Sequence, residues 1–126
     1  MPARTPEDCD RLFQEALNAG NLEALVALYE PNATLVAAPG QNATGTGAIR
    51  QALAGFVAAK PKIDLQVENT LRAGDDLAVC YGKWTLTAAT PDGGATLMSG
   101  KSVEVVRRQA DGTWRFAIDD PFGRGA

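Results

Sequence analysis

Histidine is absent from the 126 residues of this sequence. This absence excludes the commonest general base, the usual zinc ligand and every Ser–His or Cys–His nucleophile pair. Cysteine occurs only at Cys9 and Cys80, so at most one disulfide can form, and we expect two reduced packing residues. The sequence therefore predicts no bound metal and no cofactor, and it leaves carboxyl and tyrosine side chains as the candidates for chemistry.

Charge of one sign is not concentrated anywhere along the chain. The net charge is -3 and the twelve basic residues are scattered, so the sequence predicts neither nucleic-acid binding nor membrane binding. Apolar runs such as residues 35–39 are far too short to span a membrane, and the N-terminus lacks the apolar core of a signal peptide. We therefore expect a cytoplasmic protein.

The composition is that of one folded domain. Hydrophobic residues make up 45% of the chain and charged residues 21%, which is enough for a core and a small cavity. No internal repeat, linker or low-complexity segment interrupts the chain. We expect a single domain that spans residues 1–126.

Capping residues and apolar spacing predict three helices. The first begins at Thr5 and ends at Gly20, because a capping threonine precedes proline and two acids. A second helix follows over residues 22–29 and is stopped by Pro31. After a loop over residues 39–46, rich in glycine, asparagine and threonine, helical spacing resumes over residues 47–57.

Alternating apolar and polar residues predict the strands. A short strand is expected over residues 34–37, and further strands over residues 63–67, 77–88, 95–108 and 113–119. Turn residues separate the last four of these strands. This order indicates an α+β layout in which helices lie against one face of an antiparallel sheet.

Five short motifs occur in an order and spacing that resemble a known family. They are Gly20-Asn21-Leu22-Glu23-Ala24, Leu28-Tyr29, Asn32-Ala33-Thr34, Gly47-Ala48-Ile49-Arg50 and Asp111-Gly112-Thr113-Trp114-Arg115. The chain resembles the nuclear transport factor 2-like superfamily, with its SnoaL-like and ketosteroid isomerase-like members. The resemblance implies a cystatin-like cone, in which three N-terminal helices pack on a strongly curved mixed, mainly antiparallel β-sheet around a conical pocket.

The resemblance also assigns pocket positions, several of which lack the polar group of the catalytic relatives. The oxyanion-binding tyrosine falls on Phe13, the general base on Ala37 and a further pocket tyrosine on Leu53, so standard ketosteroid isomerase activity is not expected. The tyrosine that ends the second helix is retained as Tyr29. The second oxyanion acid falls on Glu104, whose carboxyl would be held neutral by burial.

Strand alternation ties the other assignments to the direction of Glu104. If Glu104 points into the cone, the concave face also carries Val79, Tyr81, Lys83, Arg115, Ala117 and Asp119. The convex face then carries Trp84, Trp114, Phe116 and Ile118, an apolar patch that we expect to be buried in a homodimer. Two alternatives remain: the reversed register, with these aromatic residues as monomer core and Lys83 and Arg115 solvated, or a Glu104 on the solvent face of its strand.

Two functions of different classes are compatible with these residues. The first is a cofactor-independent isomerase, cyclase or dehydratase for a small apolar oxygenated molecule, with Glu104 or Asp119 transferring a proton. Acids before a proline, as at Asp119, are also typical of a polar strand end. The second is a non-catalytic dimeric module that holds a ligand or docks a protein. The expected ligand contacts are Phe13, Tyr29, Ala37, Leu53, Tyr81, Lys83, Arg115 and Ala117.

Overall fold

The first helix begins and ends where its capping residues predict. The computed structural model describes residues 2–125, and its helix α1 spans Pro6–Ala19. The Thr5 hydroxyl accepts a hydrogen bond from the Asp8 amide, and the Asp8 carboxylate accepts one from the Thr5 amide. Gly20 ends the helix with a left-handed φ of 68°. These caps fix which face of α1 is turned to the sheet.

The second helix is shorter than predicted, and the strand after it is longer. Helix α2 covers only Leu22–Val26, and strand β1 (Tyr29–Ala38) already includes the tyrosine that was expected to end the helix. The cause is a long-range contact, because Tyr29 pairs with Phe116 of β6 (Trp114–Asp120). The Phe116 amide also donates to the Leu28 carbonyl at 2.7 Å. Pairing with a distant strand thus overrides the local helical pattern.

The loop predicted over residues 39–46 contains a strand. Strand β2 (Gln41–Thr44) pairs antiparallel with β1. Gly40, at a φ of 77°, takes the left-handed conformation that lets the chain reverse between the two strands. Helix α3 (Thr46–Ala58) then follows within a residue of its predicted bounds.

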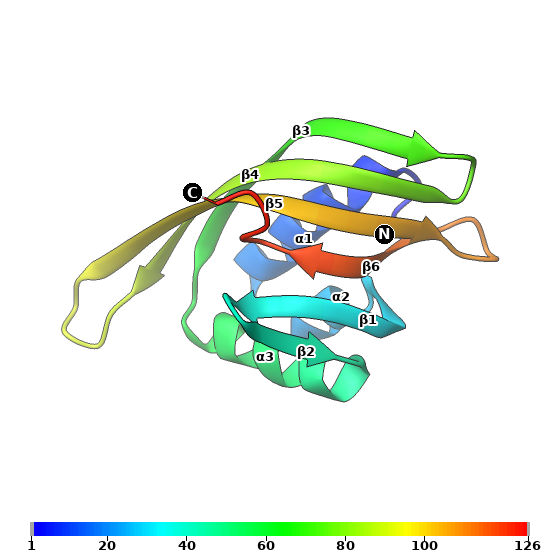
Figure 1. Ribbon diagram of the computed structural model, residues 1–126. Coiled ribbons are helices and arrows are strands. Elements are labelled where there is room, and N and C mark those ends of the chain that lie inside the picture. The colour runs from blue at the N-terminus through cyan, green and yellow to red at the C-terminus, as the bar shows by residue number, and fades with distance from the viewer. Residues whose placement is uncertain (1, 126) are drawn as a thin grey trace.

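The remaining strands complete a mixed sheet. They are β3 (Lys62–Ala73), β4 (Leu77–Ala89), β5 (Ala95–Arg108) and β6. Within residues 2–125 the sheet has six strands in the order β2-β1-β6-β5-β4-β3 (Figure 1). Only β1 and β6 of this described sheet run parallel, and the other neighbours are antiparallel. The predicted α+β class with a mixed, mainly antiparallel sheet is confirmed.

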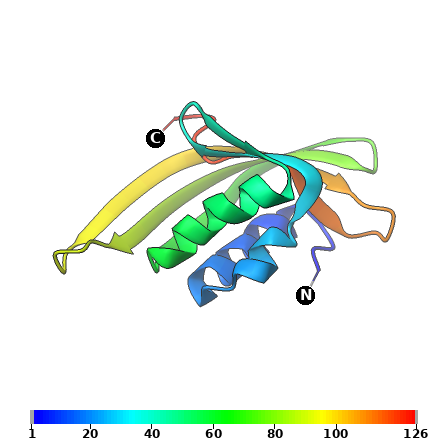
Figure 2. The same ribbon diagram turned by 90° about the horizontal axis from the view of Figure 1, so that it is seen from below.

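All three described helices lie on one side of the sheet, which curves over them (Figure 2). The core lies between these layers, where Leu25, Ile49 and Leu53 from the helical side meet Val106 and Phe116 from the sheet. The hairpin of β4 and β5 extends beyond the helices (Figure 2). Within residues 2–125, no helix combines the length and the apolar character needed to cross a membrane.

The convex apolar patch predicted from the sequence is wrong. Trp84, Trp114 and Phe116 are 6%, 4% and 1% exposed, and only Ile118 of the four is exposed, at 47%. The three aromatic residues belong to the concave side and cannot form an interface with a second subunit. The homodimer was predicted because of this patch, so the structure removes the reason for that prediction.

Cross-strand pairing explains the error in β4. Glu104 pairs with Cys80, and Trp84 pairs with Gly100. Even-numbered residues of β4 and β5 therefore share one face, so Trp84 lies on the same side as Glu104. Lys83, which was expected on the concave side, is exposed on the opposite face.

A bulge explains the error in β6. Ile118 pairs with Val105 and Phe116 with Val106, so Ala117 is an extra residue in the ladder. The extra residue reverses the alternation, and for this reason Phe116 and Asp119 both point inward although three positions separate them. Simple alternation cannot anticipate this switch.

Candidate functional site

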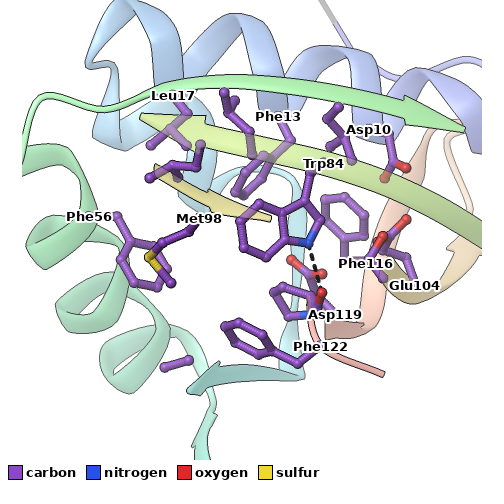
Figure 3. A pocket seen from close by; sticks show the side chains of 16 residues that line it. Asp10, Phe13, Leu17, Phe56, Trp84, Met98, Glu104, Phe116, Asp119 and Phe122 are labelled. Carbon is purple, nitrogen blue, oxygen red and sulfur yellow. Dashed lines mark hydrogen bonds between the residues drawn. The ribbon is translucent and has the colours of Figure 1, made fainter. Parts of the chain in front are cut away.

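A cavity of about 160 Å³ lies between α1, α3 and the concave face of the sheet. Its walls are mainly apolar, with Phe13 from α1, Phe56 from α3, and Trp84 and Phe116 from the sheet (Figure 3). Cavities of about 150 Å³ with apolar walls accommodate benzene. The volume therefore suits a ligand body of about one ring.

Three carboxyl groups reach this cavity from three different elements. We call Asp10 of α1, Glu104 of β5 and Asp119 of β6 the acid cluster (Figure 3). Their residues are only 2%, 2% and 5% exposed, and Glu104 and Asp119 are direct partners across neighbouring strands. No lysine or arginine of the described chain lines the cavity. The acids are thus buried without a basic counterpart in the cavity.

Asp10 and Glu104 lie close enough that each affects the pKa of the other. Burial raises the pKa of Glu104 well above its usual range, and the charge of Asp10 raises it further. Burial also raises the pKa of Asp10 to about 6, although the neighbouring Glu104 carboxyl lowers it. The favoured charge state at neutral pH is a protonated Glu104 beside an ionised Asp10.

Asp119 is held by a tyrosine. The Tyr29 hydroxyl donates a buried hydrogen bond of 2.6 Å to Asp119 Oδ2. Burial raises the pKa of Asp119 to about 7, against the lowering effect of the Tyr29 bond, and the Asp10 charge adds to the increase. Burial also raises the pKa of Tyr29, so its hydroxyl stays protonated as a donor. Asp119 can therefore both take up and release a proton near neutral pH.

A glycine makes room for the buried polar groups. A methyl group at Gly82 would lie 2.4 Å from Ser102 Oγ and 3.3 Å from Asp10 Oδ2.

Within residues 2–125, four buried oxygen atoms have no hydrogen-bond partner: both carboxyl oxygens of Asp10, Glu104 Oε1 and Ser102 Oγ. Buried polar atoms without partners are uncommon in folded proteins and need an explanation.

Trp84 is fixed in the cavity wall by contacts on several sides. Its Nε1 donates to the Pro121 carbonyl at 2.7 Å, and the Phe122 ring meets it edge-on with centroids 5.9 Å apart. The indole lies over Gly100, where a methyl group would be only 2.6 Å from the ring. The wall is therefore preformed.

The structure brings some of the predicted site residues together and separates others. Phe13, Ala37, Glu104 and Asp119 line the cavity, and Tyr29 adjoins it through its bond to Asp119. Leu53 is fully buried in the core and is not part of the cavity wall. The expected concave position is wrong for Tyr81, Lys83 and Arg115, which lie on the other face, and Ala117 is the bulged residue.

Among the cavity residues that the sequence analysis missed, Asp10, Trp84 and Ser102 bear most on the chemistry of the site. Asp10 had a usable signal, because it lies three residues before Phe13 and seven before Leu17 on the apolar stripe of the first helix. An acid on such a stripe is turned to the interior. Ser102 and Trp84 depended on the strand register, which the sequence did not fix.

The cavity acids do not resemble a metal site. Among residues 2–125, no three His, Cys, Asp or Glu side chains form a group that could hold a metal ion. Cys9 and Cys80 are both free and buried. The arrangement instead suits proton transfer within an apolar enclosure, because acids with different pKa values lie side by side.

Comparison with known proteins gives a consistent family match. A family model described as a SnoaL-like domain matches residues 10–120 of the chain. No curated protein matches it.

Several solved structures share the fold. One, named "Putative Scytalone Dehydratase" from Novosphingobium aromaticivorans, is 18% identical, with 98% of this chain and 94% of that chain covered at a TM-score of 0.83. A ketosteroid isomerase-like protein from Erwinia carotovora atroseptica is 18% identical, with coverages of 90% and 88% and a TM-score of 0.79. An NTF2-like superfamily protein from Salmonella enterica is 16% identical, with coverages of 95% and 91% and a TM-score of 0.76. At these identities the likeness shows the fold alone.

Proposed function

The chain belongs to the SnoaL-like domain family, and on that premise we propose that it is a cofactor-independent acid–base enzyme for a small apolar oxygenated molecule. The reaction class is that of an isomerase, cyclase or dehydratase, in which a proton leaves a carbon next to an oxygenated carbon. Names of structural relatives include an isomerase-like protein and a dehydratase, which agrees with this class.

The acid cluster is the observation that carries the proposal. Three buried carboxyl groups share one apolar cavity, and their pKa values are all raised by burial. An acid that stays protonated at neutral pH can donate a proton, and one that titrates near 7 can accept one. Such a set has little value for stability, because each ionised buried carboxylate without a cation destabilises the fold.

The two sheet acids have complementary roles in the proposal. Asp119, whose pKa is about 7, removes a proton from the substrate carbon while Tyr29 stabilises its ionised form. The electron pair of the broken C–H bond moves to the substrate oxygen, which takes a proton from Glu104. The charge of the neighbouring Asp10 raises the pKa of Glu104 and so keeps its carboxyl protonated. The O–H proton of the resulting enol then returns to Glu104, and Asp119 delivers its proton to a carbon, which restores an ionised Asp119 and a protonated Glu104.

Hydrogen–deuterium exchange at carbon tests the proposal. We expect the protein in D₂O to accelerate deuterium incorporation next to the carbonyl of one-ring ketones, with cyclohexanone and 4-phenylbutan-2-one as probes followed by NMR. Asp119→Asn should lower the rate by about 10² to 10⁴. Asp64→Asn, a change of the same type at an exposed position of β3, should leave it unchanged. Equal rates in Asp119→Asn and wild type would reject the proposed role of Asp119.

A second candidate is a non-catalytic carrier of the same ligands. It is favoured by Phe13 and Ala37, which give the cavity apolar walls where the catalytic relatives were expected to have a tyrosine and an aspartate. The exchange experiment separates the two. Binding of the ketones without any acceleration above buffer would support the carrier.

A further inference from the structure

We propose that the cavity end formed by Asp10, Ser102 and Glu104 is a binding site for a protonated primary amine carried on a body of about one ring. The inference goes beyond the proposed function, because binding an amine requires no proton transfer to carbon. It assigns a chemical class of ligand to oxygen atoms that the fold leaves without partners.

This end of the cavity has an excess of hydrogen-bond acceptors. Both oxygens of Asp10, Glu104 Oε1 and Ser102 Oγ are buried and lack partners within the described chain. One carboxyl proton of Glu104 and one hydroxyl proton of Ser102 cannot satisfy all of them. A primary ammonium group brings three N–H donors and no acceptor, which is the complement of this set.

Within residues 2–125, no basic side chain lines the cavity. The six ion pairs within residues 2–125 all lie elsewhere. The Arg124 guanidinium lies over the Tyr81 ring on the other face of the sheet and donates to the carbonyls of Gly82 and Ser102. An ammonium ligand would supply the positive charge that the ionised Asp10 lacks within the described residues.

The walls suit a ring in size and chemistry. The cavity volume of about 160 Å³ is close to that of apolar cavities that hold benzene, and aromatic side chains such as Phe13, Trp84 and Phe116 surround it. Aromatic walls favour a ring and also a nearby cation. An anionic ligand of the same size would instead face buried carboxylates of like charge.

The site should respond to pH through several groups that face it. The titratable groups buried around it are Cys9 and Asp10 from α1, Tyr29 from β1, Cys80 from β4, Glu104 from β5 and Asp119 from β6. Burial raises the pKa of both thiols and of Tyr29, so these three groups stay protonated and the carboxyl groups titrate. Ionised carboxylates bind an ammonium group and protonated ones do not. Because the pKa of Asp10 is about 6, amine affinity should rise between pH 5 and pH 8.

Isothermal titration and NMR with three probes of similar size test the proposal. The probes are 2-phenylethylamine, 2-phenylethanol and 3-phenylpropionate. At pH 8 we expect the amine to bind at least about tenfold more tightly than the alcohol, since hydrogen bonds to charged groups are the stronger ones. The acid should bind most weakly. Binding should shift the signal of the Trp84 indole N–H in the cavity wall, and amine affinity should fall about tenfold at pH 5.

Variants locate the binding. Asp10→Asn keeps the shape of the side chain and removes its charge, so it should weaken the amine about tenfold or more and leave the alcohol unchanged. Glu15→Gln, on the exposed face of the same helix, is the matched control and should change neither. Circular dichroism confirms that both variants are folded.

Three outcomes would overturn the proposal: equal affinity for amine and alcohol, no saturable amine binding, or the same amine affinity in Asp10→Asn as in wild type. The last would place the amine on the outer surface. Failure here is distinguishable from failure of the proposed enzyme, because ketone exchange depends on Asp119 and is measured without an amine.

Discussion

At the scale of single residues, burial decides the protonation of the acid cluster. Glu104 is 2% exposed and stands beside the Asp10 carboxyl, so its charged form is disfavoured by solvent exclusion and by a like charge. The position of Glu104 on the concave face agrees with the prediction from the sequence. Its role in chemistry stays a prediction.

Replacing Glu104 by glutamine should stabilise the protein increasingly as pH rises. The folded protein binds the Glu104 proton more tightly than the unfolded chain, because burial raises the pKa. Wild-type stability therefore falls above the unfolded pKa of about 4.3, by about 1.4 kcal/mol per pH unit, until the folded pKa is passed. The stability of Glu104→Gln should not fall in this way, because glutamine does not titrate. Denaturant unfolding of both proteins between pH 4 and pH 8 measures the difference.

The control for this experiment is Glu15→Gln, which changes an exposed acid paired with Arg11. Exposed ion pairs contribute little, about 0 to 1 kcal/mol, so its effect should be small throughout the pH range. If Glu104→Gln behaved like this control, Glu104 would be solvated and would have no place in the cavity chemistry.

At the scale of elements, the C-terminal strap of residues 121–125 joins the cavity wall to the outer face of the sheet, because its Pro121 and Phe122 line the cavity. Its Arg124 side chain donates to the carbonyl of Gly82 at 2.8 Å, and its backbone exchanges hydrogen bonds with Lys101 of β5. At its other end, the Pro121 carbonyl accepts from Trp84 Nε1. The strap thus links the outer face of the sheet to a wall residue.

Shortening Arg124 to alanine should loosen the strap without unfolding the domain. The loss of its hydrogen bonds should lower the free energy of unfolding by about 1 to 2 kcal/mol. Amide exchange at Lys101 should become faster, and the Trp84 indole N–H signal should move. Arg107→Ala, at another arginine of the outer face, pairs with Glu30 and should leave both signals unchanged. Unchanged exchange in Arg124→Ala would show that the strap is held by its backbone alone.

Element boundaries show where sequence reasoning succeeds and fails at this scale. The first helix was predicted within a residue, because Thr5 and Gly20 act through neighbours on the chain. The second helix was overextended, because Tyr29 pairs with Phe116, far away in sequence. Local signals carry no information about such a partner.

At the scale of the whole molecule, the side of the sheet on which the aromatic residues lie decides between a monomer core and a subunit interface. Trp84 is 6% exposed and lines the cavity, and Ile118 is 47% exposed on the outer face. The sequence had placed both in one convex patch. The two residues therefore offer a direct comparison.

Trp84→Arg should largely unfold the protein, and Ile118→Arg should not. Loss of a buried tryptophan costs about 3 to 5 kcal/mol, and an unpaired buried charge adds to that, against a total stability of about 5 to 15 kcal/mol. Surface substitutions usually change stability by about 0.5 kcal/mol or less. Circular dichroism shows whether each variant is folded, and denaturant unfolding measures how much stability each has lost. A folded Trp84→Arg with halved mass in sedimentation would restore the convex patch and its dimer.

The sequence by itself determined the α+β class, the capped first helix, the order of the long strands and the family resemblance. Each rests on residues that act through neighbours or through periodic spacing along the chain. The family resemblance assigned Phe13, Ala37, Glu104 and Asp119 to the pocket, and all four line the cavity. The absence of histidine left carboxyl and hydroxyl groups as the candidates for chemistry.

Only the tertiary structure decided which side of each strand faces the cavity. The pairing of Glu104 with Cys80 and the bulge at Ala117 set the register, and a shift of one residue turns every side chain to the other face. The same pairing brought Asp10 from the first helix against Glu104 from the fifth strand. The acid cluster is a product of these long-range contacts, because its pKa values depend on burial that no single segment can provide.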